Sequence, residues 1–159
     1  MASTTAAIIR KMRDLLLEQA EITRFVGERV FVSASPDFPP DVAAFQPPAI
    51  TVSPGDVSTA RQNHHARAET VAVAITVYLA VLDEEELILG GNNSPGLTEI
   101  MDALDSLLDN SHEDGGLMES YFRVDKTGES KITLLESLGT AGYLGAKTIT
   151  FEVEDLQAR

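Results

Sequence analysis

Two adjacent histidines are the residues best suited to chemistry in this sequence. His64 and His65 lie close to Glu69, so two imidazoles and a carboxylate could together bind a metal ion or transfer protons. Neighbouring residues of a strand point to opposite faces, however. The chain has no cysteine, and no third histidine supports the pair in this stretch. We therefore expect exposed histidines or contacts with a partner, with no metal ion and no cofactor.

A glycine-rich stretch, G-T-A-G-Y-L-G, runs from Gly139 to Gly145. A loop that binds phosphate also needs a lysine followed by serine or threonine, between a strand and a helix. This stretch lacks that pair, so nucleotide binding is not expected. With no other catalytic motif present, the sequence predicts that the chain is not an enzyme.

The net charge of −13 is unevenly distributed along the chain. No Lys or Arg occurs between Ala68 and Phe122, whereas this span holds most of the excess of carboxylates: Glu69, Asp83, Glu84, Glu85, Glu86, Glu99, Asp102, Asp105, Asp109, Glu113, Asp114 and Glu119. Affinity for nucleic acid backbones needs clustered cations, so the balance argues against it. A solvated surface that keeps the protein soluble is the simplest explanation.

The cations gather in two other places, at Arg10, Lys11 and Arg13 and again at residues 61–67. The first group interrupts an apolar stretch, which argues against a secretory signal peptide. Arg10 could pair with Asp14 one helical turn on, which is a structural explanation. A basic surface that binds a partner is the alternative.

The elements that would position these charges are organised around the apolar run from Glu69 to Asp83. Its β-branched residues alternate, and its other face is nearly as apolar, which predicts a long central strand buried on both faces. Residues 4–25 predict an amphipathic helix that stops at Gly27. A second helix is predicted to begin at Pro95 and to bury the stripe Leu97, Ile100, Met101, Leu104, Leu107 and Leu108.

The remaining segments are predicted to be short strands and their connections. We expect strands at 29–35, 49–53 and 146–154, a proline-rich connection at 36–48, a protruding hairpin or mobile loop at 56–68, a linker at 83–96, and a hairpin of strands 120–126 and 130–138. Strands and helices do not alternate. The predicted fold is therefore α+β, a single domain over 1–159 with a mostly antiparallel sheet of five or six strands and two main helices packed against it.

This order of elements resembles the tail terminator (tail completion) proteins of long-tailed bacteriophages. The matching stretches are V-G-E-R-V-F-V (26–32), F-Q-P-P-A-I-T-V (45–52), V-A-V-A-I-T-V-Y (71–78) before the helix of 97–108, and T-I-T-F-E-V-E (148–154). The resemblance covers nearly the whole chain, but it is one of pattern and order. The loops at 56–68 and 109–120 are longer than in the shortest members, so loop contacts do not carry over.

The resemblance implies a structural virion protein and no catalysis. It implies a ring, commonly of six subunits, that caps the tail tube and joins it to the neck. The implied partners are further copies of the chain, the tail tube protein and a neck or head-completion protein, while contact with a tail sheath stays open. DNA would pass through the ring without specific binding, and no membrane is involved. The implied location is the virion, after assembly in the host cytoplasm.

Two hypotheses join the charge pattern to such a ring. Carboxylates lining the channel would repel DNA, and the candidates are Glu84, Glu85, Glu86, Asp102, Asp105 and Asp109. Ring closure requires one surface to meet a different surface on the neighbour. Candidates for contacts with a neighbouring subunit or with the tube are Arg10, Lys11, Arg13, Arg61, His64, His65 and Arg67.

Other classes of protein remain as alternatives. The nearest is another head–tail joining or neck protein, which electron microscopy of tails made without the protein would distinguish. A small ligand-binding regulatory α+β module is the other, and it would show an apolar pocket and a ligand-dependent melting temperature.

Overall fold

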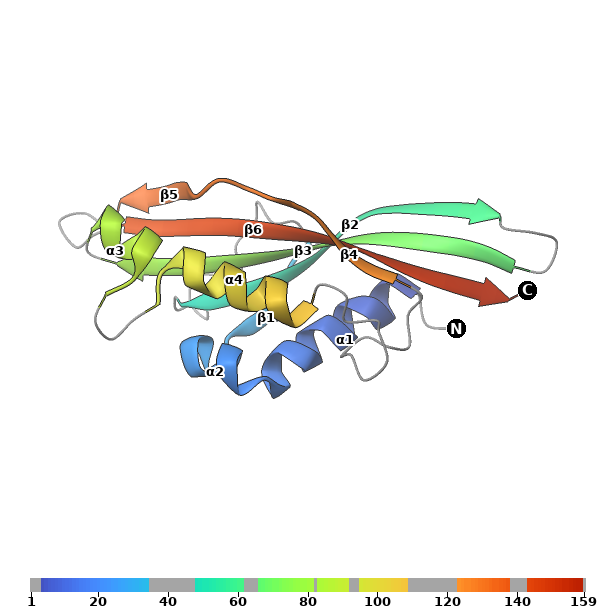
Figure 1. Cartoon of the computed structure of the whole chain (residues 1–159), viewed down its shortest axis with the longest axis horizontal. Coiled ribbons are helices and arrows are strands. Elements are labelled where there is room, and N and C mark those ends of the chain that lie inside the picture. Colours follow the sequence, from blue (N-terminus) through green and yellow to red (C-terminus); the bar gives the residue numbers. More distant parts are fainter. Residues whose placement is uncertain are drawn as a thin grey trace.

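The fold is a twisted sheet with helices packed on one face (Figure 1). The computed structural model describes residues 4–34, 48–61, 66–81, 83–91, 95–108, 123–137 and 143–158. Its elements are α1 (Thr4–Glu18), α2 (Ala20–Val26), β1 (Val30–Val32), β2 (Ala49–Arg61), β3 (Ala66–Val81), α3 (Glu84–Leu89), α4 (Leu97–Leu108), β4 (Arg123–Glu129), β5 (Thr133–Ser137) and β6 (Tyr143–Ala158). The predicted α+β class and mostly antiparallel sheet are confirmed.

The described strands form one six-stranded sheet in the order β1-β2-β3-β6-β4, with β5 also pairing with β6. Only β1 and β2 run parallel; the other pairs are antiparallel. The predicted central strand is confirmed, since β3 lies between β2 and β6 over nearly its whole length. Residues 56–61 and 66–68 form the paired ends of β2 and β3, which agrees with the predicted hairpin, while residues 62–65 lie outside the described residues.

Both faces of β3 are buried. Val71, Val73, Ile75, Val77 and Leu79 join one core with the apolar stripes of α1 and α4. On the opposite face Ala74, Thr76 and Tyr78 are also buried. Hydroxyl groups are paired there, with Thr76 Oγ1 2.8 Å from Thr148 Oγ1 and Ser33 Oγ 2.8 Å from Ser53 Oγ. These pairs satisfy polar groups that would otherwise be costly to bury.

The predicted helix of residues 4–25 is divided in two. Gln19 has an extended backbone (φ −91°, ψ 116°), and its carbonyl accepts from the N–H of Ile22 and of Thr23 to start α2. The chain therefore turns between α1 and α2 while both keep their apolar sides on the core. The predicted stop is confirmed: Gly27 ends α2 with φ +61°, a region that glycine adopts without steric cost.

The predicted linker at 83–96 is wrong in its first half, because residues 84–89 form α3. Asp83 caps this helix, its carboxylate accepting the Glu86 N–H at 2.8 Å. Leu87 anchors α3 to the core and contacts the sheet so closely at Gly145 that a Cβ there would lie 2.9 Å from Leu87 Cδ1.

The second long helix starts later than predicted. Pro95 lies before α4, and the carbonyl of Gly96 accepts the first bond, from the Ile100 N–H at 3.2 Å. A Cβ at Gly96 would overlap the Ile88 carbonyl oxygen. This position therefore needs glycine, because the end of α3 and the start of α4 meet there backbone to backbone.

The predicted hairpin over 120–138 is also wrong. β4 and β5 do not pair with each other but follow one another along the same edge of β6. The connection between them keeps bonding to β6, since the Ser130 N–H donates to the Thr148 carbonyl at 2.8 Å and Ser130 Oγ accepts the Thr148 N–H at 3.0 Å. The sixteen residues of β6 offer an edge long enough for both short strands.

Candidate interaction surfaces

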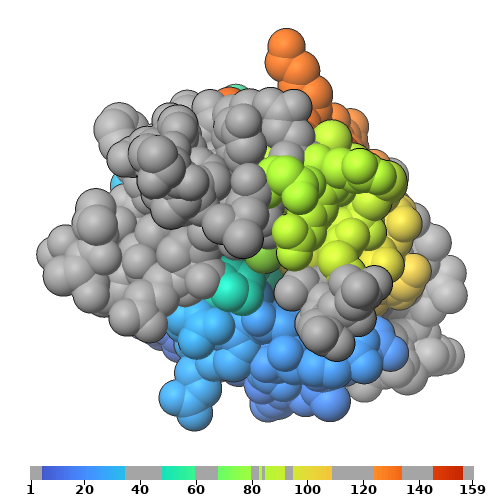
Figure 2. All heavy atoms as spheres, turned by 90° about the vertical axis from the view of Figure 1, so that its left-hand side faces the viewer, coloured from blue at the N-terminus to red at the C-terminus, as the bar shows by residue number. Residues whose placement is uncertain are grey.

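Helix α3 forms one end of the molecule, and Figure 2 shows it on the surface there. Asp83 and Glu85 are exposed and Glu86 is half-buried. Two apolar side chains on the same helix are also open to solvent, Ile88 at 40% and Leu89 at 62% exposure. This end of the molecule therefore combines carboxylates with exposed apolar groups, which is typical of a contact surface.

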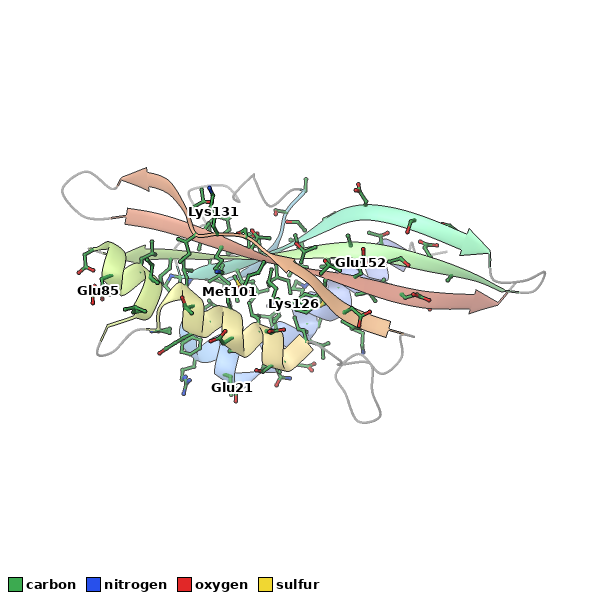
Figure 3. The ribbon with its side chains drawn as sticks, turned by 45° about the horizontal axis from the view of Figure 1, so that its top comes forward. Glu21, Glu85, Met101, Lys126, Lys131 and Glu152 are labelled. Atoms are coloured by element: carbon green, nitrogen blue, oxygen red, sulfur yellow. The ribbon has the colours of Figure 1, made fainter. Side chains whose placement is uncertain are left out.

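Helix α4 carries the second group of predicted carboxylates. Met101 of α4 points toward the sheet, whereas Glu85 of α3 points away from it (Figure 3). On α4, Glu99 and Asp102 are exposed. Asp105 is different. Its Oδ2 lies 3.3 Å from Lys126 Nζ of β4, so this carboxylate is not part of a bare acidic surface.

Two of the remaining candidates have side chains that the structure does not describe. Asp109 falls in the segment 109–122, and for Glu84 the structure describes the backbone in α3 but not the side chain. The acidic candidates that are described and exposed are therefore Glu85 and Asp102, with Glu86 half-buried.

The Asp105–Lys126 pair belongs to a network of ion pairs between α4 and the sheet edge. Lys126 Nζ lies 2.8 Å from Glu129 Oε2, and Lys147 Nζ lies 3.1 Å from Glu129 Oε1. The hydrogen bond from Lys126, aided by Lys147, holds the pKa of the Glu129 carboxyl below its usual value although partial burial opposes this. The same bond to Glu129 raises the pKa of the Lys126 ammonium. These charges tie α4 to β4 and β6.

The basic group of α1 lies on the outer side of the helix layer. Arg10 is exposed, and Lys11 and Arg13 are half-buried. The ion pair formed by Asp14 is with its neighbour Arg13, at 3.3 Å, and not the predicted one with Arg10. The guanidinium of Arg10 is thus available on the surface next to that pair.

An apolar depression adjoins these arginines, between α1 and the β1–β2 edge of the sheet. Val32 at its margin is 48% exposed although it lies on the same face of β1 as buried Val30, because it is the last residue of this short edge strand. The depression is lined by Thr5, Ala6, Ile9, Arg10, Arg13, Val32 and Pro54. Apolar walls with two cations at the rim suit an apolar side chain that is accompanied by carboxylates.

The second predicted basic group, at residues 61–67, belongs to an arm of the sheet. β2, β3 and β6 extend together beyond the helices (Figure 1). The backbones of Arg61 and Arg67 are paired in register at the end of the β2–β3 hairpin. The side chains of both, and all of His64 and His65, lie outside the described residues.

The described residues do not form the metal site that the sequence analysis considered first. In that part of the chain no three His, Asp or Glu side chains come close enough to hold a metal ion. In the glycine-rich stretch, Tyr143 to Gly145 begin β6, and the residues before them are not described. None of the described helices has the length and apolar character needed to span a membrane.

Sequence reasoning missed three features of these surfaces. The short helix α3 could have been found from Asp83 and Glu86, whose spacing is that of a capping box. The apolar depression and the Lys126–Glu129–Lys147 network combine residues far apart in the chain, so no local sequence pattern predicts them. Searches against models of protein families and against curated proteins found no match to this chain.

Proposed function

We propose that this chain is a ring-forming structural protein of a tailed bacteriophage, a tail terminator that caps the tail tube and joins it to the neck. The order of elements that carries the sequence resemblance supports this function. So does the α+β architecture, in which a continuous sheet stiffens the subunit and the described helices cover one of its faces.

The observation that carries the proposal is the separation of charge over the surface. Exposed carboxylates lie on α3 and α4, at Glu85, Glu99 and Asp102, whereas the basic group lies on α1, which also carries the exposed carboxylates Asp14 and Glu18. A subunit with two surfaces of opposite sign can meet a copy of itself head to tail, and repetition of such a contact closes a ring.

The carboxylates of α4 are the proposed lining of the channel. Glu99 and Asp102 are exposed on the helix surface and lie in a segment that has no cation from 68 to 122. A ring repeats these charges around its axis. Phosphates in the channel would be repelled by them, so DNA would move through without being retained.

The test is the mass of the protein in solution, alone and with tubes assembled from the tail tube protein of the same phage. We expect a ring-sized species in light scattering, or density at tube ends in electron micrographs. A chain that stays monomeric and leaves tube ends bare would refute the function. Tails made without the protein should also be irregular in length, which a stopper or other neck protein would not cause.

A further inference from the structure

The exposed end of α3 has the composition of a surface that binds a partner. We define the α3 knob as Asp83, Glu85, Glu86, Ile88 and Leu89. Its two apolar side chains are among the few large ones in the described residues that stay open to solvent. Carboxylates precede them on the same short helix, with the helix itself fixed by the Asp83 cap and by buried Leu87. The knob therefore presents exposed apolar side chains next to carboxylates.

The depression beside α1 is complementary to this knob in both respects. We define the α1 groove as Thr5, Ala6, Ile9, Arg10, Arg13, Val32 and Pro54. Its wall is apolar at Ile9, Val32 and Pro54, which matches Ile88 and Leu89. Its rim carries the guanidinium groups of Arg10 and of Arg13, which already has Asp14 at 3.3 Å, and these cations match the carboxylates of Glu85 and Glu86. Arginine at such a rim is well suited to carboxylates because it offers several donors in a planar arrangement.

The two surfaces cannot meet within one chain. In Figure 1, α3 lies at one end of the sheet, while α1 begins toward the other end, and both are attached to the same core. The knob of one molecule can therefore fill only the groove of another.

We propose that the α3 knob of one subunit docks into the α1 groove of the next copy of this chain. The proposal rests on the proposed function, since it names the contact that would close the ring. The knob supplies Ile88 and Leu89 to the apolar wall, and Glu85 and Glu86 lie against Arg10 and Arg13 of the neighbour. Each molecule gives a knob and receives one, so the contact is heterologous and repeats around an axis.

Two single variants test this contact without disturbing the core, because both residues are exposed. Leu89→Glu disables the knob, and Val32→Glu disables the groove. Each variant alone should lose self-association, with an apparent Kd raised about tenfold or more. Val57→Glu is the matched control, since Val57 is 47% exposed on the β2 arm and belongs to neither surface. Circular dichroism establishes that all three variants are folded.

Mixing the two disabled variants gives the decisive measurement. The Leu89→Glu chain keeps an intact groove and the Val32→Glu chain keeps an intact knob, so one contact can form between them. Sedimentation of the mixture should show a one-to-one dimer that grows no further, although each variant alone is monomeric. A mixture that stays monomeric while the wild type assembles would overturn the proposal, and so would a variant that assembles normally.

Binding to tube ends separates this contact from the proposed function. If the wild type caps tubes but the mixture does not dimerise, the knob-and-groove contact is refuted and the tail function stands. If the wild type neither assembles nor caps tubes, both are refuted. If Val32→Glu loses tube binding while its self-association is intact, the groove receives the tube protein instead, which also overturns the proposal.

An exchange of charge tests the polar part of the contact. Arg10→Glu alone and Glu85→Lys alone should each weaken self-association, and the chain carrying both substitutions should recover much of it, since the pair is restored with reversed signs. Failure of the double variant to recover, with all three folded, would exclude the pairing of Arg10 with Glu85.

Discussion

Lys126 Nζ lies 2.8 Å from Glu129 Oε2, although the two residues stand on either side of a register shift in β4. The shift between Lys126 and Gly128 brings both side chains to the helix-covered side of the sheet edge. Asp105 reaches the same ammonium from α4 at 3.3 Å, and Lys147 reaches Glu129 from β6 at 3.1 Å. Three elements that already share the apolar core are thus also joined through charges at this edge.

Replacing Glu129 by glutamine should lower the free energy of unfolding by about 0.5–1 kcal/mol near neutral pH, a magnitude typical of a partly exposed pair. The pKa of Glu129 is lowered from 4.5 in the folded state, chiefly by the hydrogen bond from Lys126, so its contribution is present above that value and is lost as pH falls through the lowered pKa. The pKa of Lys126 is raised from 10.5, so its contribution is present below that value and is lost as pH rises through the raised pKa.

The difference between the wild type and Glu129→Gln should therefore be largest from about pH 5 to pH 9 and should shrink in acid. Urea titrations at a series of pH values measure it. Glu28→Gln, at an exposed carboxylate beyond α2, is the control. A constant difference down to pH 2 would mean that the ion pair is not its cause.

Replacing Gly96 by alanine should cost about 2 kcal/mol or more, because the new Cβ would overlap the Ile88 carbonyl and lie 2.5 Å from the Gly90 nitrogen. Backbone atoms cannot move aside as a flexible side chain can. Gly128→Ala is the matched control, since nothing lies within 4 Å of a Cβ there. Thermal unfolding of the two variants decides the matter: equal melting temperatures would contradict the close approach of α3 and α4.

Replacing Asp83 by alanine should loosen α3 by about 1 kcal/mol, because the Glu86 N–H loses its acceptor and a helix of six residues has little other stabilisation. Hydrogen exchange of the α3 amides should become faster while that of α4 is unchanged. Asp83→Asn keeps an acceptor oxygen and should exchange almost as the wild type does. Faster exchange in both variants would point to the charge and not to the cap.

Reversing the carboxylates of α4 tests the proposed channel. The chain with Glu99→Lys and Asp102→Lys should assemble but retain double-stranded DNA, with an affinity that falls steeply as salt rises. The chain with Glu18→Lys and Glu21→Lys makes the same change in net charge at exposed positions of α1 and α2, and should retain less. Gel shifts of the assembled species over a range of salt concentrations measure both, and equal retention would place Glu99 and Asp102 outside the channel.

Elements with a sustained period were predictable from the sequence. The alternation from Val71 to Leu79 gave the central strand, and the apolar stripes of residues 8–16 and 97–108 gave the two main helices, because a period repeated over several turns identifies both the element and its buried side. The six residues of α3 are too few to show a helical period, and three of them are glutamates, so their sequence predicts a linker and not a helix.

Pairings between distant segments were not predictable in the same way. The turn-like residues near Thr127 and Gly128 suggested a hairpin, whereas β4 and β5 each pair with β6. Likewise the charge of Asp105 is plain in the sequence, but its partner Lys126 is brought to it only by the fold. The sequence therefore shows that the segment is acidic, but it does not show that the charge of Asp105 is neutralised by Lys126.

The position of β6 has a consequence for how the chain acquires its structure. Ile75 pairs with Ile149, and every residue of β3 from Ala66 to Val81 has its partner in a strand made long afterwards. While the chain emerges from the ribosome, the apolar middle of the sheet has a neighbour on one side only, and β4 and β5 have none. Folding therefore waits for the last strand, and a chain released before residue 143 would expose an adhesive edge at the centre of the sheet to other nascent chains.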